Sequence, residues 1–142
     1  MSLLIQKLLL ICVLTFLSMH NVLGVPRRHV NIVNSLEDNL NLTIHCKSAD
    51  DDLGSHLLHH GDSYGFKFLN DFFADTQFFC SFQWEGEFKW YDIYIASRDS
   101  NKCYICNWYI QKSGPCRVLY PEGSGSECFP WNINHWCNTF WT

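Results

Sequence analysis

Apolar and polar residues alternate along the chain after residue 29. Polar residues separate Val30 from Ile32, and segment 40–46 places an apolar residue at every second position. A period of two puts alternate side chains on opposite faces of a strand. The pattern therefore predicts two half-buried strands, and the polar run 34–39 between them has the composition of a hairpin connection.

The same alternation recurs further along the chain. It is clearest over segments 78–84, 91–95 and 104–110, with shorter candidates around Leu57 and over 64–68. Helical periodicity is missing from these segments, and only 72–74 has the composition of a single helical turn. Short strands rich in aromatic and β-branched residues predict an all-β fold, a small disulfide-stabilised antiparallel β-sandwich with Cys80 and Cys106 inside it.

The first 24 residues have the layout of a cleaved secretory signal peptide. Lys7 precedes an apolar run over 8–17, and Gly24 ends the segment with a small residue. A membrane anchor needs about 18 or more apolar residues, which this run does not reach. We therefore predict a mature chain that begins near Val25, is secreted and extracellular, and does not insert into a membrane.

Size and charge narrow the range of partners. Removal of the first 24 of 142 residues leaves 118, the size of one domain, and loss of Lys7 changes the net charge from -4 to -5. An acidic chain whose only basic run is 27–28 is a poor partner for nucleic acid. We divide the mature chain into a β-sandwich domain over 25–120 and a Cys/Trp-rich C-terminal extension over 121–142.

Seven cysteines remain in the mature chain, and a secretory route predicts that they pair. Their positions are Cys46, Cys80, Cys103, Cys106, Cys116, Cys128 and Cys137. The odd number predicts a monomer with one unpaired thiol, or a dimer bridged through that thiol. A zinc site at 103, 106, 128 and 137 is the alternative, disfavoured by the eight-residue gap in the second pair.

An ordered series of short motifs resembles the plant self-incompatibility S-protein homologue family. The motifs are His45–Ser48, Asp50–Gly54, Phe66–Phe68, Thr76–Phe82, Trp90–Tyr94, Cys106–Trp108 and Gly114–Cys116. The resemblance implies a small secreted β-sandwich with disulfides and no enzymatic activity. It also implies a signalling ligand that binds a cell-surface receptor, as the founding members do in the pistil.

The resemblance also bears on the cysteines. It aligns Cys46, Cys80, Cys106 and Cys116 with the usual family set, within which we predict at least two disulfides of open connectivity. Family members commonly end soon after the position of Cys116, whereas this chain continues for 26 residues. We predict that Cys128 and Cys137 pair within this tail, which leaves Cys103 as the odd thiol.

Several clusters suggest chemistry, and each has a simpler interpretation. Three consecutive acids, Asp50, Asp51 and Asp52, could bind calcium but lack further oxygen ligands, so a solvated turn is preferred. His56, His59 and His60 could serve a secreted ribonuclease-like hydrolase, yet they have no defined catalytic partner. We predict no catalytic residues, no metal site and no cofactor. The tryptophans of the tail either bind cell-wall glycan or cover a sheet edge.

Exposed loops on a rigid sandwich are the expected recognition surface. The candidate receptor contacts are Asp50, Asp51, Asp52, Glu85, Glu87, Arg98, Asp99 and Lys102, with Glu85 and Glu87 at a hairpin tip. Asn41 begins the Asn-Leu-Thr glycosylation sequence and is predicted to face solvent. The function classes are a secreted ligand, a secreted hydrolase and a wall glycan-binding module, and the ligand is preferred.

Overall fold

A computed structural model describes residues 2–22, 27–70, 75–119 and 125–132. It begins with helix α1 (Leu3–Val22), whose side chains over residues 3–17 are exposed. These side chains therefore do not pack against the strands. Within the described ranges, the structure has no helix with the length and apolar character needed to span a membrane.

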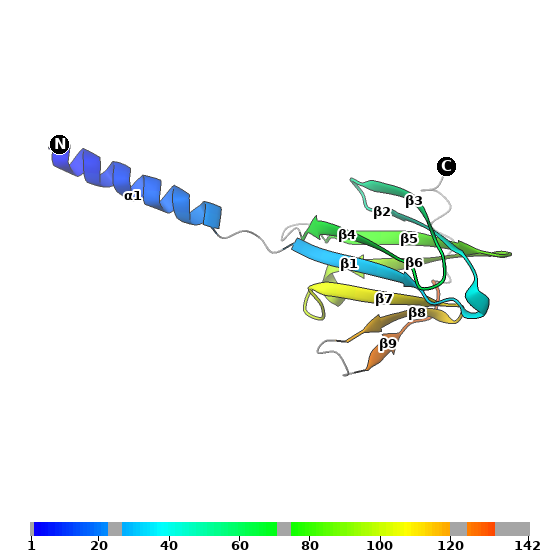
Figure 1. Cartoon of the computed structure of the whole chain (residues 1–142). Helices are drawn as coiled ribbons and strands as arrows, with labels where there is room; N and C mark the ends of the chain where they lie inside the picture. The colour runs from blue at the N-terminus through cyan, green and yellow to red at the C-terminus, as the bar shows by residue number, and fades with distance from the viewer. Residues whose placement is uncertain (1, 23–26, 71–74, 120–124, 133–142) are drawn as a thin grey trace.

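Two β-sheets form the rest of the described chain (Figure 1). The five-stranded sheet has the order β4 (Ser63–Leu69), β1 (Arg27–Asn34), β7 (Ile105–Gln111), β8 (Gly114–Val118) and β9 (Ser126–Cys128). The four-stranded sheet has the order β3 (Asp52–Leu58), β2 (Leu42–Lys47), β5 (Gln77–Trp84) and β6 (Glu87–Ile95). Two short helices, η1 (Glu37–Asn39) and α2 (Ala96–Asp99), connect strands. The predicted β-sandwich is confirmed.

The core lies between the sheets, where the predicted alternation places it. Val30 and Ile32 of β1 are fully buried, and so are Leu42 and Ile44 of β2. Trp108 of β7 is fully buried as well. Each of these strands therefore presents one apolar face to the opposite sheet.

The predicted hairpin between β1 and β2 is wrong. The two strands belong to different sheets, so the segment 35–41 crosses from one layer to the other. The buried Asn34 organises this crossing, because its side-chain amide donates to the carbonyl oxygens of Leu40 (2.8 Å) and Leu58 (3.0 Å). Its side-chain oxygen accepts the N–H of Leu36 (3.0 Å), and Leu36 is buried too. A polar run can therefore form a layer crossing as readily as a tight turn.

One strand pair departs from the predicted antiparallel order. β1 and β7 run parallel, with His29 opposite Ile105 and Ile32 opposite Trp108. All other strand pairs in the described chain are antiparallel. Residue spacing does not reveal this pairing, because the two strands are more than seventy residues apart in sequence.

Three disulfides are present in the described residues. Cys46 on β2 pairs with Cys80 directly opposite on β5, Cys103 with Cys106, and Cys116 with Cys128. Only the first joins two members of the predicted four-cysteine set, so the prediction of at least two disulfides within that set is wrong. Cys103 is therefore not the odd thiol. The three described cysteines of the disfavoured zinc alternative, at 103, 106 and 128, are all in disulfides.

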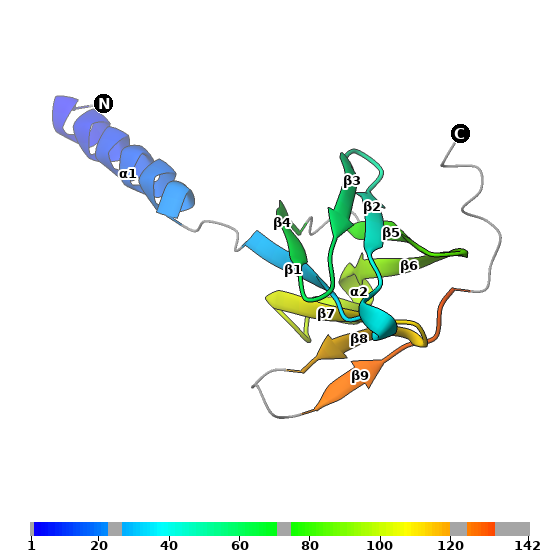
Figure 2. The ribbon, with the colours of Figure 1, turned by 45° about the vertical axis from the view of Figure 1, so that its right-hand side comes forward.

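The predicted pairing of Cys128 with Cys137 is wrong. Residues 126–128 form strand β9, which places Cys128 opposite Cys116 of β8 in the antiparallel register. The sheet thus continues past residue 120, as Figure 2 shows for β7, β8 and β9 along one edge. Cys137, the possible helical turn at 72–74 and the cleavage region near Val25 lie outside the described residues.

The chain after β9 folds back against the sandwich. The Phe129 ring lies 5.7 Å from Trp108, and the Trp131 ring lies 5.3 Å from Phe82. Gly114 permits this approach, because a Cβ there would overlap the carbonyl oxygen of Phe129. Trp131 therefore packs against β5, an interior strand of the four-stranded sheet, and does not cover a sheet edge. The other tryptophans of the tail lie outside the described residues.

Candidate recognition surface

The loops of the sandwich gather at two opposite ends. We call one the η1 end, because η1 lies there beside the turns 85–86 and 112–113 (Figure 1). Backbone bonds tie it together: the Gly61 N–H donates to Asn34 and the Ser35 N–H to Ile110. The α2 end holds the loop 48–51, α2 and the segment 100–104. The predicted contact loops are divided between these ends, so they do not form one surface.

Glu85 and Glu87 lie at the η1 end, at the predicted hairpin tip. Glu85 and Gly86 form the turn between β5 and β6, and Gly86 supplies the positive φ of 73°. Residues 85–88 are all exposed. Glu87 forms an ion pair with Lys89 (2.8 Å). The tip is therefore open to a partner, and Glu85 presents an exposed charge there.

The acidic segment 50–52 lies at the α2 end. The Ser48 hydroxyl accepts the backbone N–H groups of Asp50 (3.3 Å) and Asp51 (3.0 Å), which shapes the solvated turn. Asp52 already belongs to β3 and contacts His45 and Lys47. The hydrogen bond from His45 is the main reason why the pKa of Asp52 lies well below its usual value. Asp50 and Asp51 remain available to a partner.

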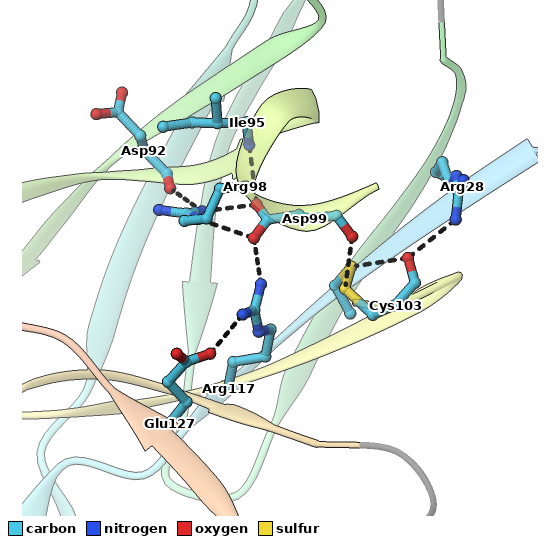
Figure 3. The surroundings of a disulfide bond; sticks show 9 residues. Arg28, Asp92, Ile95, Arg98, Asp99, Cys103, Arg117 and Glu127 are labelled. Atoms are coloured by element: carbon cyan, nitrogen blue, oxygen red, sulfur yellow. Dashed lines mark hydrogen bonds and ion pairs between the residues drawn. A yellow bond between two sulfur atoms is a disulfide. The ribbon is translucent and has the colours of Figure 1, made fainter. Parts of the chain in front are cut away.

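Asp99 is wrong as a receptor contact, because its side chain is fully buried. The four-residue helix α2 turns the carboxylate inward, where one oxygen contacts the guanidinium of Arg117. The other oxygen accepts the Ile95 N–H (2.9 Å) and Arg98 Nη2 (2.7 Å), as Figure 3 shows. Arg98 is partly buried and serves this cluster, whereas Lys102 is exposed. The polar composition of segment 97–102 predicted an exposed loop and did not indicate that Asp99 points inward.

The cluster around Asp99 rests on aromatic rings. The Arg98 guanidinium lies 5.2 Å from the Tyr91 ring centre and 5.3 Å from that of Trp108. Burial lowers the pKa of Arg98, but the hydrogen bond and charge of Asp99 outweigh burial and raise it. Burial also raises the pKa of Tyr91 to about 12. Arg98 Nη1 donates to the neutral Tyr91 hydroxyl (2.8 Å), so the cluster is a fixed internal support.

Sequence reasoning missed Arg117, which completes this support. The side chain is 1% exposed on β8, where one guanidinium nitrogen contacts Asp99 and another contacts Glu127 of β9. The only sequence signal is a basic residue inside a strand, between Cys116 and Val118. Such a residue is rarely buried without an acidic partner, and that partner comes from a segment assigned to a loop.

The three histidines contact separate groups. The His56 ring stacks on Tyr64 at 3.8 Å. His59 Nδ1 lies 2.9 Å from the side-chain oxygen of Asn41, and His60 Nδ1 lies 2.9 Å from the carbonyl oxygen of Leu36. This arrangement gives no pair of imidazoles on a shared site. Asn41 itself is exposed beside β2. The described residues also contain no group of three or more metal-ligating side chains.

Comparisons with known proteins match most of the chain. The family model described as "Plant self-incompatibility protein S1" matches residues 29–131. S-protein homolog 20 of Arabidopsis thaliana is 45% identical over 106 residues, covering 73% of this chain and 76% of the relative. S-protein homolog 5 of the same plant is 50% identical over 90 residues, covering 63% and 67%. The match to residue 131 includes β9, so this part of the tail is shared with the family.

A solved structure has the same fold. It is described as that of SPH (Self-Incompatibility Protein Homologue) proteins, "a widespread family of small, highly stable, secreted proteins from plants". The TM-score is 0.56 at 17% identity, and the match covers 77% of this chain and 97% of the solved one. At this identity the likeness supports the sandwich architecture.

Proposed function

Because this chain belongs to the plant self-incompatibility S1 family, we propose that it is a secreted ligand that acts by binding a cell-surface receptor. The family is not a known enzyme family. Secretion is supported by the description of the structural neighbour and by the exposed apolar helix α1, which we assign to a signal peptide cleaved near Val25. The mature protein is then the sandwich with its C-terminal tail.

The observation that carries this proposal is the contrast between a fixed interior and exposed loops. Disulfides cross-link β2 to β5 and β8 to β9, and the buried carboxylate of Asp99 is neutralised inside the fold. The loops at both ends present exposed charges, including Asp50, Asp51, Glu85 and Lys102. A rigid scaffold lowers the entropic cost of presenting such loops, as a binding protein requires.

Binding of the labelled mature protein to intact plant protoplasts tests the function. We expect saturable binding that unlabelled protein displaces. A matched pair of charge reversals asks which end takes part: Asp50→Lys with Asp51→Lys at the α2 end, and Glu85→Lys at the η1 end. Turnover of RNA or cell-wall glycans without saturable binding to cells would overturn the proposal in favour of a hydrolase.

We also propose that the secreted form carries a glycan at Asn41. Asn41 is exposed immediately before the first residue of β2, and Thr43 completes the acceptor sequence. Treatment with an N-glycosidase is expected to reduce the mass of the secreted protein, and Asn41→Gln is expected to abolish that shift. An unchanged mass after treatment of the unmutated protein would show that the sequence is unused.

A further inference from the structure

The basic side chains of the sandwich fall into two groups. Five form ion pairs within the described chain: Lys47, Lys89, Arg98, Lys112 and Arg117. The other four, Arg27, Arg28, Lys67 and Lys102, form no ion pair with any carboxylate that the structure describes. In a chain with a net charge of -4, such a group is a local exception.

Arg27, Arg28 and Lys67 lie on β1 and β4 at the α2 end, and Lys102 lies in the segment that leads into the neighbouring strand β7. Arg27 is opposite Leu69, and Lys67 is opposite His29, the next outward-facing residue of β1. Arg28 Nη1 donates to the carbonyl oxygen of Cys103 (3.1 Å), which follows Lys102 in the chain. We call this surface the basic corner.

Exposed apolar side chains lie within the basic corner. Leu69 is 56% exposed, Tyr104 62% and Ile105 56%. Ile105 lies opposite His29 on β7, and the Arg28 guanidinium lies 4.0 Å from the centre of the Tyr104 ring. Tyr104 and Ile105 are adjacent, and Leu69 lies on the other side of β1. Exposed apolar groups beside arginine and tyrosine are typical of surfaces that bind another protein.

The disulfide between Cys103 and Cys106 gives this surface a fixed shape. Tyr104 and Ile105 are the two residues that the bond encloses, and both half-cystines are buried. The buried sulfurs hold the loop down while its two enclosed side chains point to solvent. Because the disulfide already restrains this loop, this chain loses little backbone entropy when a partner binds. The Cys-x-x-Cys sequence thus forms a structural disulfide that restrains this loop.

We propose that the basic corner is the receptor-binding surface, and that it docks onto an acidic patch with an apolar centre on a protein ectodomain. This inference rests on the proposed function and names the face that performs it. Tyr104, Ile105 and Leu69 enter the apolar centre, while Arg27, Lys67 and Lys102 face carboxylates at its rim. The charges steer association and the apolar contacts supply most of the affinity.

Protoplast binding with two matched double variants tests the assignment. Tyr104→Ser with Ile105→Ser removes the apolar pair and keeps the disulfide. The control is Leu57→Ser with Tyr109→Ser, which removes side chains of 58% and 38% exposure outside the basic corner. We expect about a tenfold or larger increase in Kd for the corner variant and no change for the control. Near-ultraviolet circular dichroism checks that both variants keep the native fold.

Charge and partner class are tested in two further arms. Arg27→Glu with Lys67→Glu is expected to weaken binding and to reduce its dependence on salt concentration. Protease treatment of the protoplasts is expected to abolish binding. Binding that survives protease, and that vesicles of phosphatidylserine and phosphatidylcholine reproduce, would identify a lipid surface and overturn the inference.

The outcomes separate this inference from the function on which it rests. If the unmutated protein binds saturably and neither corner variant weakens that binding, the corner assignment is wrong and the ligand function stands. If the unmutated protein does not bind saturably, the ligand function fails and the inference falls with it.

Discussion

Ion pairs hold both ends of the sandwich, but water reaches them to very different extents. At the α2 end, Asp99 and Arg117 have side-chain exposures of 0% and 1%. At the η1 end, Asp38 and Lys112 have exposures of 75% and 41%. Each pair joins an aspartate to a basic side chain, and the largest difference between the two pairs is their burial.

At the α2 end the carboxylate of Asp99 compensates two arginines, and both arginines pack on aromatic rings. Arg117 lies 5.5 Å from the Trp108 ring centre, and Arg98 lies 5.3 Å from it. Because water does not solvate these buried charges, each charge is stabilised mainly by its ion-pair partner. The cluster therefore connects α2 to β8, and loss of Asp99 removes the carboxylate that both arginines share.

At the η1 end the pair serves a loop contact. Lys112 Nζ contacts Asp38 at 2.6 Å, and the Lys112 backbone N–H donates to Glu37 at 3.0 Å. These bonds join η1 to the turn between β7 and β8. Solvent competes with them and salt screens them, so they contribute little to stability. Burial, more than distance, separates a structural ion pair from a surface one.

The largest expected effect is the loss of Asp99. Asp99→Ala leaves Arg98 and Arg117 close together in the interior without a carboxylate between them, which should cost about 3–5 kcal/mol of unfolding free energy. Urea denaturation of the secreted protein measures this loss, with Asp51→Ala as the exposed control of the same chemistry. Equal midpoints for the two variants would show that the buried cluster is dispensable.

The disulfide beside the buried cluster should have the next largest effect. The double variant Cys116→Ser with Cys128→Ser removes the cross-link between β8 and β9, which closes a loop of sequence separation 12. Strand β9 carries Glu127, the partner of Arg117. A loop of this size predicts a loss of about 3 kcal/mol on the chain-entropy account. Thermal unfolding of the double variant measures the loss. An unchanged Tm would indicate that β9 is held by packing alone.

The ion pair of Glu127 with Arg117 is intermediate in burial between the two pairs compared above, because the Glu127 side chain is 43% exposed and that of Arg117 is 1% exposed. Glu127→Gln keeps a hydrogen-bond acceptor for Arg117 and removes the charge. Arg117 retains Asp99, so we expect a loss of about 1 kcal/mol or less. Urea denaturation at low and high salt concentration distinguishes the charge from the packing, because only the charge contribution is screened. A loss as large as that of Asp99→Ala would place Glu127 within the buried cluster.

The sequence predicted most of the strands but not β8, and it predicted the connections between strands poorly. Alternation located segments 78–84 and 91–95 correctly as β5 and β6, because one buried face leaves a period-two pattern. The link from β1 to β2 was misassigned because turn-forming residues do not reveal which layer the chain enters next. The tail pairing failed for a related reason, since β9 is only three residues long and shows almost no alternation.

The charged residues were harder to assign than the apolar ones. Asp99 and Asp51 both occur in polar segments, but one is buried and the other exposed. The difference arises from α2 and from Arg117 on β8, a residue distant in sequence. The exposure of Tyr104 and Ile105 also depends on a residue pairing, the disulfide between Cys103 and Cys106. The spacing of the cysteines in the sequence did not determine that pairing.

The smallest expected effect is an acid-dependent one at the η1 end. The side-chain hydrogen bond from Lys112 and then its charge lower the pKa of Asp38. The pKa of Glu37 is lowered first by a hydrogen bond from the backbone N–H of Glu37 and then by one from the backbone N–H of Lys112. A carboxyl with a lowered folded-state pKa stabilises the fold above its unfolded pKa, and this stability is lost as pH falls through the folded value. Asp38→Asn with Glu37→Gln should therefore lower the urea midpoint slightly near neutral pH. The difference from the unmutated protein should shrink below about pH 4 and with added salt. A difference that stays constant from about pH 7 to about pH 2 would show that this pair acts through shape and not through charge.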